Sequence, residues 1–318
     1  MSSFQPPEIC RHGLTEVYQP QGGAETVQAV AHVVFVHGLF GHPRKTWTAS
    51  LERSATLRLF LIVLSLRGSG NSTSKSTPQG RDGGSDQDRG GDNKVFWPAA
   101  LLPQVIPDSR IHTWGYDADV DRLRSPVSLN TVPQYAANVL SDIADLIEID
   151  GNNLPLIFVA HGLGGIVVKA AINQSFETRG TRLSIVAPAV RGVVFLGTPH
   201  RGSDSVSIPE IAYNITRGVG RNPNGKLLQA LEKNSEILDR THKSFLQKIS
   251  GCPKLLVAAF REEMETRKLF FFSTFVVKPD SATLGIANEE ESSIPTNHSD
   301  MTKFGSSSDV GFKRVSAQ

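Results

Sequence analysis

The sequence predicts an α/β fold, in which a mostly parallel sheet is covered by helices on both faces. Two patterns predict it: short apolar runs rich in β-branched residues alternate with segments of helical periodicity, and glycine-containing turns follow several of these runs. The composition agrees, because 318 residues of which 39% are hydrophobic and 20% charged can bury a large core. Length alone allows one large domain or two smaller ones, and the order of the motifs favours a single domain over residues 1–318.

Seven segments are expected to form strands. Gly13 to Pro20 is typical of a short edge strand, and the apolar run His32 to Val36 is typical of a strand buried in a parallel sheet. The others are Arg110 to Tyr116, Leu154 to Val159, Val190 to Leu196, Lys254 to Phe260 and Phe271 to Val277. Pro133 to Ile149 carries apolar residues at helical spacing, and Pro133 suits a first helical turn. We expect functional groups on the loops at the carboxyl ends of the strands.

One segment departs from this alternation. From Arg67 to Lys94 the sequence is rich in glycine, serine, aspartate, arginine and glutamine, with almost no apolar residue. Such a segment buries too little apolar surface to offset the entropy of ordering, so we expect a disordered insertion there. The apolar run before it, Leu57 to Leu66, is either a buried core element or a stretch that does not belong to the fold.

Several functional classes are disfavoured. The net charge is +2 and no basic run with interleaved aromatic residues is present, so we expect no nucleic-acid partner. Cys10 and Cys252 are too few for a disulfide framework or a zinc site, which favours a reducing, intracellular compartment. Met1 to Arg11 does not resemble a secretory signal, and Leu57 to Leu66 is about half as long as a membrane-spanning helix. No histidine pair has metal-ligand spacing, and Gly220 to Leu227 only imitates a phosphate-binding loop, so we expect neither metal nor cofactor.

The most specific motif is VAHGLGGIVVKAAI, from Val159 to Ile172, where an expected strand passes through a tight turn of small residues into a helix. In a nucleophile elbow, the pattern G-x-S-x-G places a serine on such a turn, with small residues two positions before and after it. Ala160 and Gly164 meet the size requirement. The central residue is Gly162, which has no hydroxyl with which to form an acyl-enzyme. The alternative interpretation is a plain glycine-rich strand, turn and helix.

Backbone N–H groups of two loops are candidates for an oxyanion hole. The loop from His37 to Gly41 follows the first buried strand, where hydrolases with such an elbow place one oxyanion donor. Gly38 and Leu39 are the candidates there, and Leu163, directly after the elbow centre, is the candidate for the second donor. The alternative for the first loop is a turn with a satisfied histidine.

A further set of side chains is a candidate for substrate binding. The segment from Gly197 to Ser203 follows an expected strand and is predicted to line the site, although a rigid loop without ligand contact is an equal alternative. The candidates are His37, His161, Thr198 and His200.

Two residues occur in the chain order expected for the acid and the histidine of a catalytic triad. Glu262 and Glu263 follow an expected strand directly, and His298 follows the last expected strand in NHSDMTKF. In this fold the order is nucleophile, acid, histidine, so the order here is as required. A solvated carboxylate and a surface histidine are the alternatives for each residue alone.

Together these motifs resemble the serine-active-site-containing family, a branch of the α/β hydrolases related to the GPI inositol-deacylase-like lipases. They are also similar to the lipase-like module at the N-terminus of many fungal NACHT, ankyrin and TPR proteins. The segments that carry the resemblance are VVFVHGLFGHPRKTW, RIHTWGYDADV, VAHGLGGIVVKAAI, GVVFLGTPHRGSD and SIPTNHSDMTKF. The resemblance covers nearly the whole chain except about residues 51–94.

The resemblance implies an α/β-hydrolase fold, hydrolysis of lipid or other esters, and association with endoplasmic reticulum and mitochondrial membranes. By position, the nucleophile, acid and base fall on Gly162, Glu262 and His298, with Glu262 rather than Glu263 directed at His298. Two functions follow. The chain is a lipase-like or esterase-like enzyme that acts on an acyl ester, or it is an inactive relative that binds an acyl ligand or a protein partner. The location expected is intracellular, either cytoplasmic or peripheral to those membranes.

Overall fold

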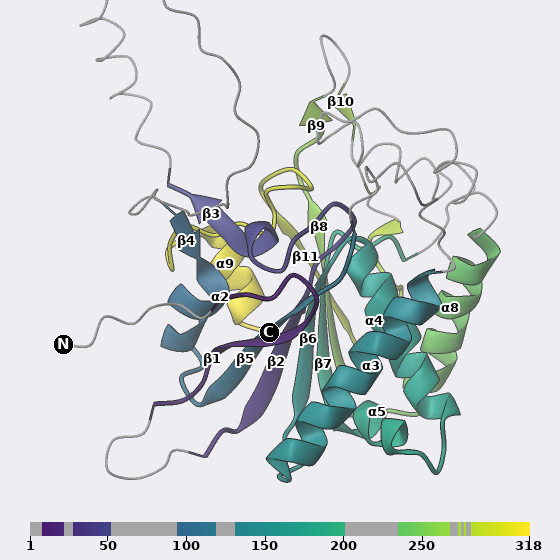
Figure 1. Cartoon of the computed structure of the whole chain (residues 1–318). Coiled ribbons are helices and arrows are strands. Elements are labelled where there is room, and N and C mark those ends of the chain that lie inside the picture. The colour runs from purple at the N-terminus through teal and green to yellow at the C-terminus, as the bar shows by residue number, and fades with distance from the viewer. Residues whose placement is uncertain are drawn as a thin grey trace, which may run out of the picture.

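A seven-stranded sheet forms the centre of the computed structural model (Figure 1). The structure describes residues 8–21, 28–51, 94–118, 131–200, 235–267, 273–274, 277 and 281–318. Within them the strand order is β1-β5-β2-β6-β7-β8-β11, and only the pairing of β1 with β5 is antiparallel. The strands are β1 (Gly13–Tyr18), β2 (Ala31–Val36), β5 (Ser109–Gly115), β6 (Leu156–His161), β7 (Val190–Leu196), β8 (Leu256–Glu262) and β11 (Glu289–Ile294). The predicted α/β fold with a mostly parallel sheet is confirmed.

The central strands form where the sequence has continuous apolar runs. All six residues of β2 are buried, because helices cover this part of the sheet on both faces. β7 has the predicted bounds, and β1, β2, β5, β6 and β8 differ from prediction by one or two residues at their ends. β1 forms an edge of the sheet, as expected.

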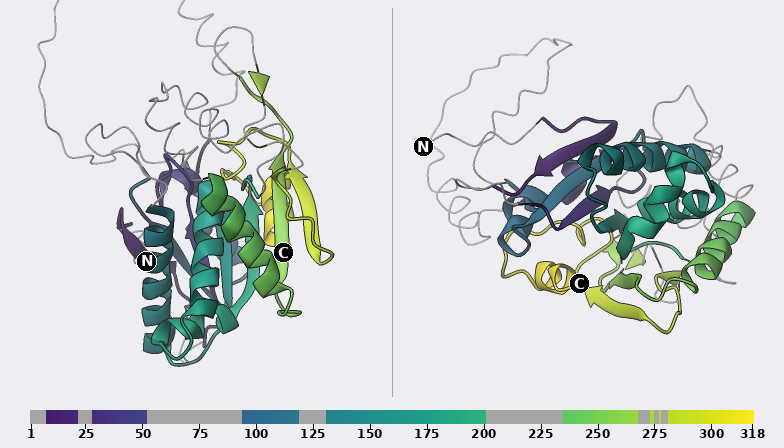
Figure 2. Two further views of the ribbon diagram at one scale, coloured as in Figure 1. Left: turned by 90° about the vertical axis from the view of Figure 1, so that its right-hand side faces the viewer. Right: turned by 90° about the horizontal axis from the view of Figure 1, so that it is seen from below.

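Helices cover the two faces of the sheet unequally (Figure 2). One face carries α3 (Thr131–Asp150), α4 (Leu163–Glu177), α5 (Val186–Ala189) and α8 (Ser235–Ile249). The other carries the shorter α2 (Trp97–Ala100) and α9 (Val310–Ser316), which pack with Trp47 of the 3-10 helix η1 (Lys45–Trp47). The remaining 3-10 helices are η2 (Leu102–Gln104) and η3 (Arg182–Ile185). The helix predicted from Pro133 is confirmed as α3 and begins two residues earlier.

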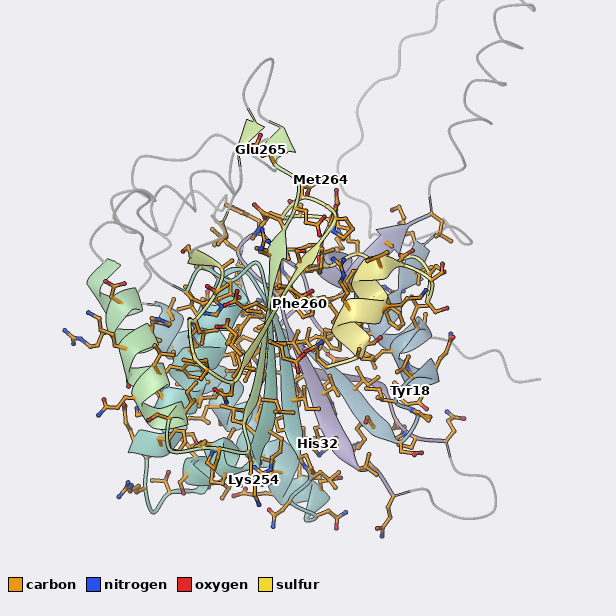
Figure 3. All side chains as sticks on the ribbon, turned by 180° about the vertical axis from the view of Figure 1, so that it is seen from behind. Tyr18, His32, Lys254, Phe260, Met264 and Glu265 are labelled. Atoms are coloured by element: carbon orange, nitrogen blue, oxygen red, sulfur yellow. The ribbon has the colours of Figure 1, made fainter. Side chains whose placement is uncertain are left out.

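The last strand of the sheet is not the one predicted from the sequence. Of the range 271–277, the structure describes Ser273, Thr274 and Val277. Ser273–Thr274 forms β10, which pairs with β9 (Thr266–Arg267) in a separate two-stranded sheet beyond Met264 and Glu265 (Figure 3). The strand beside β8 is β11, whose sequence is EEESSI. A partly exposed edge strand needs no apolar run, so the search for such runs missed it.

Two short strands, β3 and β4, which we call the β3–β4 hairpin, lie on either side of a gap in the described residues. β3 (Thr48–Ser50) pairs antiparallel with β4 (Lys94–Phe96), and Ser50 lies opposite Lys94. Lys94, counted in the predicted insertion, is therefore the first residue of a strand. The rest of that insertion and the apolar run 57–66 lie outside the described residues.

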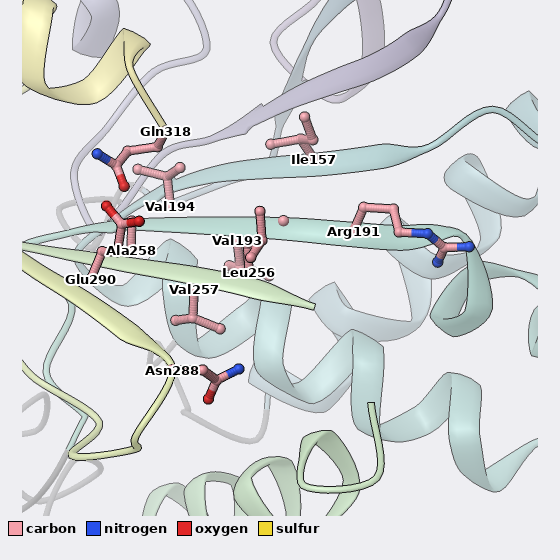
Figure 4. Close-up of a pocket in the computed structure, with 11 residues that line it drawn as sticks. Ile157, Arg191, Val193, Val194, Leu256, Val257, Ala258, Asn288, Glu290 and Gln318 are labelled. Atoms are coloured by element: carbon pink, nitrogen blue, oxygen red, sulfur yellow. The ribbon is translucent and has the colours of Figure 1, made fainter. Parts of the chain in front are cut away.

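A small apolar cavity of about 140 Å³ lies over β6, β7 and β8 on the face that α2 and α9 cover (Figure 4). Ile157, Val194 and Ala258 line it, together with Gln318 at the end of the described chain. Leu256 beside it is 65% exposed. The cavity shares no lining residue with the site described below.

Candidate active site

Two of the predicted site residues form a buried pair at the carboxyl edge of the sheet. Glu262 is the last residue of β8, and His298 lies in the loop that follows β11. The Nδ1 atom of His298 lies 2.9 Å from Oε2 of Glu262, and both side chains are almost completely buried. The backbone N–H of Val277 donates to the other carboxylate oxygen at 3.3 Å. A carboxylate that accepts the Nδ1 proton leaves Nε2 as a proton acceptor.

The neighbouring carboxylate points elsewhere. Glu263 is exposed, and its carboxylate accepts a hydrogen bond from the hydroxyl of Ser293 at 2.6 Å and forms an ion pair with Arg314. These contacts hold the pKa of Glu263 below its usual value. Glu262 ends β8 with a buried side chain, and the next residue, Glu263, has an exposed side chain.

The acceptor atom of His298 faces the turn between β6 and α4. This turn is Gly162, whose backbone has φ +53° and ψ −126°. A Cβ atom built on Gly162 would lie 3.5 Å from Nε2 of His298. A hydroxyl carried on such a side chain would therefore lie within hydrogen-bonding reach of the imidazole. The structure brings Gly162, Glu262 and His298 together in the arrangement that a nucleophile, a base and its acid require.

Other glycines let the turn pack closely against neighbouring loops. A Cβ on Gly164 would lie 2.4 Å from the carbonyl oxygen of His37, and one on Gly165 would lie 2.2 Å from Oγ1 of Thr198. Real Cβ contacts are longer, so a side chain at either position would force the start of α4 away from the loops after β2 and β7.

The predicted oxyanion-hole residues lie beside this turn. Gly38 and Leu39 line a cavity of about 210 Å³ that also reaches Gly162 and His298. Leu163 is the first residue of α4, and a Cβ on Gly38 would lie 3.4 Å from its backbone nitrogen. The loop after β2 and the start of α4 are therefore adjacent.

His37 lies behind this loop rather than in the cavity lining. Its Nδ1 donates to the carbonyl of Gly38 at 3.0 Å, and the backbone N–H of Tyr116 donates to its Nε2 at 3.3 Å. Its ring stacks on Tyr116 with centroids 4.5 Å apart. Burial lowers the pKa of His37 to about 4, so the imidazole is neutral and supports the loop.

His161 is the predicted substrate-binding side chain that lines the cavity. Its Nε2 donates to the backbone carbonyl of His298 at 3.1 Å, and the two rings lie 4.6 Å apart. Burial, followed by the nearby charge of His298, lowers the pKa of His161 well below its usual value. A neutral His161 thus fixes the backbone that carries the candidate base.

Thr198 and His200 are buried but do not line this cavity. Thr198 lies under Gly165, and the backbone N–H of His200 donates to the carbonyl of Ser281 at 2.6 Å. The ring of His200 packs edge-on against Phe195. These residues shape the turn after β7.

The structure adds side chains that sequence reasoning missed. His42, Lys45, Ser299, Thr302 and Lys303 also line the cavity. Lys45 and Lys303 stand inside two of the segments on which the family resemblance rests, PRKTW and DMTKF. Their place in these segments was the only sign in the sequence that they belong to the site. Lys45 and Lys303 are far apart in the chain, so the sequence did not indicate that they line one cavity.

The described residues contain neither a metal-binding cluster nor a membrane-spanning helix. No set of three or more histidine, cysteine, aspartate or glutamate side chains there is arranged to hold a metal ion. No helix in the same part of the chain is long and apolar enough to cross a membrane.

The strand order and the geometry of the site are those of the α/β-hydrolase fold. In sequence, the chain is a distant homologue of Protein SERAC1. It is 24% identical to the Mus musculus protein over 260 residues, which are 81% of this chain and 34% of that protein. It is 25% identical to the Homo sapiens protein over 260 residues, with the same two shares. The chain therefore spans about a third of the length of these relatives.

Solved structures are also similar to the chain, at low identity. The mature lipase BlEst2 of Bacillus licheniformis is 15% identical, with a TM-score of 0.46, and the alignment covers 91% of this chain and 92% of the lipase. No family model matches the chain.

Proposed function

We propose that the chain binds lipid or other acyl esters beside His298 and hydrolyses them slowly, with a water molecule in the role of the missing nucleophile. The observation that carries the proposal is the intact pair of His298 and Glu262, whose acceptor nitrogen faces the space beside Gly162. A pair kept in this geometry can act as a general base even where no hydroxyl side chain stands in front of it.

The proposed reaction needs no cofactor. Nε2 of His298 takes a proton from water, and the hydroxide attacks the ester carbonyl, while Glu262 stabilises the imidazolium. Backbone N–H groups of Leu163 and of Gly38 or Leu39 hold the oxyanion. The tetrahedral intermediate then expels the alkoxide, which takes the proton from His298, leaving a carboxylic acid and an alcohol. Serine proteases that lose a triad member retain about 10³- to 10⁴-fold acceleration over water, which sets the scale expected here.

An ester assay with a matched pair of variants tests this proposal. Hydrolysis of p-nitrophenyl butyrate is measured for the wild type, for His298→Ala, and for the matched pair Glu262→Gln and Glu263→Gln. We expect the first two variants to lose the activity and Glu263→Gln to keep it, because Glu263 faces Arg314 instead of His298. Activity that survives in His298→Ala would come from another site and would contradict the proposal.

The alternative is a binding or signalling module without catalysis, and Gly162 itself favours it. A residue without a hydroxyl offers no nucleophile, and glycine adopts a positive φ without strain. Such a module would hold an acyl ligand or a protein partner. Wild-type protein that binds esters but shows no hydrolysis above that of His298→Ala would support this function.

The proposed location follows from the resemblance to membrane-associated hydrolases. We place the protein inside the cell, in the cytoplasm or at the periphery of endoplasmic reticulum and mitochondrial membranes. Cell fractionation with a carbonate wash tests this, because a peripheral protein is released by the wash.

A further inference from the structure

A second, larger cavity adjoins the candidate active site. Its volume is about 580 Å³, and it lies beside the β3–β4 hairpin that is labelled in Figure 1. His42, Lys45 and Lys303 line both this cavity and the one that contains His298. A ligand whose ester carbonyl lies beside His298 can therefore extend into the second cavity without leaving the surface of the protein.

The charges around this second cavity are unbalanced. Of the residues that the structure describes, Arg44, Lys45, Lys94 and Lys303 line it, against one carboxylate, that of Asp300. The whole chain carries 33 lysines and arginines against 31 aspartates and glutamates, so this excess is local. We call these four cations and Asp300 the basic groove.

The carboxylate does not neutralise the groove. Asp300 forms an ion pair with Lys303 at 2.9 Å and accepts a hydrogen bond from the side chain of Asn297. Among the described residues, Arg44 and Lys45 form no ion pair with a carboxylate, and Arg44 lies over the ring of Phe96. Two positive charges are thus left for another partner.

One histidine, His42, lines the basic groove, and the positive charges there affect its pKa. Burial lowers the pKa of His42, and the charges of Lys45, Arg11 and Arg44 lower it further. The backbone N–H groups of Arg44 and Lys45 donate to its Nδ1, so neutral His42 carries its proton on Nε2 and adds a donor. An anion in the groove would meet cations and a neutral donor together.

We propose that the basic groove binds a phosphate or carboxylate group that belongs to the same molecule as the ester held beside His298. This inference rests on the proposed function and narrows its ligand class to acyl esters with an anionic group. Of the three residues that line both cavities, Lys45 and Lys303 carry positive charges, so they would contact that group directly. Solvated lysines on a protein surface are common, and the shared lining of the two cavities distinguishes this pair.

The experiment uses octyl phosphate, neutral octyl glucoside and inorganic phosphate as probes, with affinities from isothermal titration calorimetry on the full chain. The variants are Lys45→Met, Lys303→Met and both together. Lys243→Met is the matched control, because Lys243 is an exposed lysine on α8 beside a different pocket. Circular dichroism and thermal unfolding confirm that each variant is folded.

We expect octyl phosphate to bind about tenfold more tightly than octyl glucoside, and the double variant to lose that preference, as expected when charge-assisted contacts are removed. Lys243→Met should bind like the wild type, and the preference should fall between about 50 mM and about 200 mM NaCl.

Three results would overturn the inference: equal binding of the two octyl probes, a preference that survives in the double variant, or inorganic phosphate binding as tightly as octyl phosphate. The last result would mean a free anion site unconnected to the ester cavity. Octyl phosphate is not a carboxylic ester, so its binding is independent of hydrolysis. Protein that binds it through Lys45 and Lys303 but cleaves no ester would contradict the proposed hydrolysis and support this inference.

Discussion

At the scale of the residue, the backbone conformation of Gly162 determines how a side chain at this position would change stability and activity. Its φ of +53° lies where residues with a Cβ are strained, at about 1–3 kcal/mol for each such residue. We predict that Gly162→Ser lowers the free energy of unfolding by about that amount. The variant should also gain esterase activity, because its hydroxyl would lie within reach of Nε2 of His298. Urea unfolding and the p-nitrophenyl butyrate assay measure the two effects.

Gly162→Ala is the matched control for this variant. It introduces the same backbone strain without a hydroxyl, so it should lose similar stability and gain no activity. Adding Glu262→Gln or His298→Ala to Gly162→Ser should abolish the gain. A folded Gly162→Ser protein that cleaves no ester or lipid would favour the binding module.

A second prediction at the residue scale concerns Lys169 and the pH dependence of stability. It is buried on α4, with Nζ 3.4 Å from Nδ1 of His242 and 5.6 Å from the centre of the Phe195 ring. Burial lowers the pKa of Lys169 to about 7 from 10.5. The unfolded chain binds the proton more tightly than the folded chain does, so stability should rise as pH increases from 7 towards 10.

The Lys169→Met variant isolates this contribution. Wild-type stability should increase relative to that of Lys169→Met by about 4 kcal/mol between pH 7 and pH 10. Below pH 7 the buried charge is present in full, and there the variant should be the more stable of the two. Urea unfolding of both proteins at each pH gives the difference, and parallel stability curves would contradict the lowered pKa of Lys169.

At the scale of the element, Tyr116, directly after β5, supports the loop that follows β2. Its hydroxyl donates to the carbonyl of His37 at 3.0 Å, and its ring stacks on that residue. We predict that Tyr116→Phe lowers the free energy of unfolding by about 1–3 kcal/mol, because a buried acceptor loses its donor. Tyr18→Phe is the control. The Tyr18 hydroxyl donates to Pro107 at an exposed edge, so water can replace it with little loss.

The sequence predicts those elements whose burial leaves an apolar pattern. β2 and β7 are rich in buried valine and phenylalanine, and both were predicted within one residue. β11 was missed because EEESSI at a sheet edge carries no such pattern. At the site, motif order proposes His298 with either Glu262 or Glu263, and the family resemblance selects Glu262. The structure places Glu262 and His298 2.9 Å apart. Lys45 and Lys303 could not be predicted to meet, since only the packing of distant loops brings them together.

At the scale of the whole molecule, the β3–β4 hairpin allows a test of the segment outside the described residues. Ser50 and Lys94 are opposite each other, so a short turn can join them. From the polar composition of residues 67–93, we predict that deleting them leaves the free energy of unfolding unchanged or slightly raised. Urea unfolding measures this, and a clear loss of stability would mean that the segment contributes packing.

A larger deletion decides the place of the apolar run 57–66. Replacing residues 51–93 with Asn-Gly shortens the connection by about 40 residues. The lower entropic cost of closing the shorter loop should alone stabilise the fold by about 2–3 kcal/mol. If the run packs in the core, its loss should outweigh this gain, and the variant should be less stable than the wild type.

The same hairpin has a practical consequence for protein engineering. Because Ser50 and Lys94 lie opposite each other, a fluorescent protein whose termini lie close together could replace residues 51–93 without separating the strands. Ser50 and Lys94 also line the basic groove, so a ligand bound in the groove would touch both junctions. We expect a ligand in the groove to change the fluorescence of a protein inserted at this point, and a fluorescence titration with octyl phosphate measures the change.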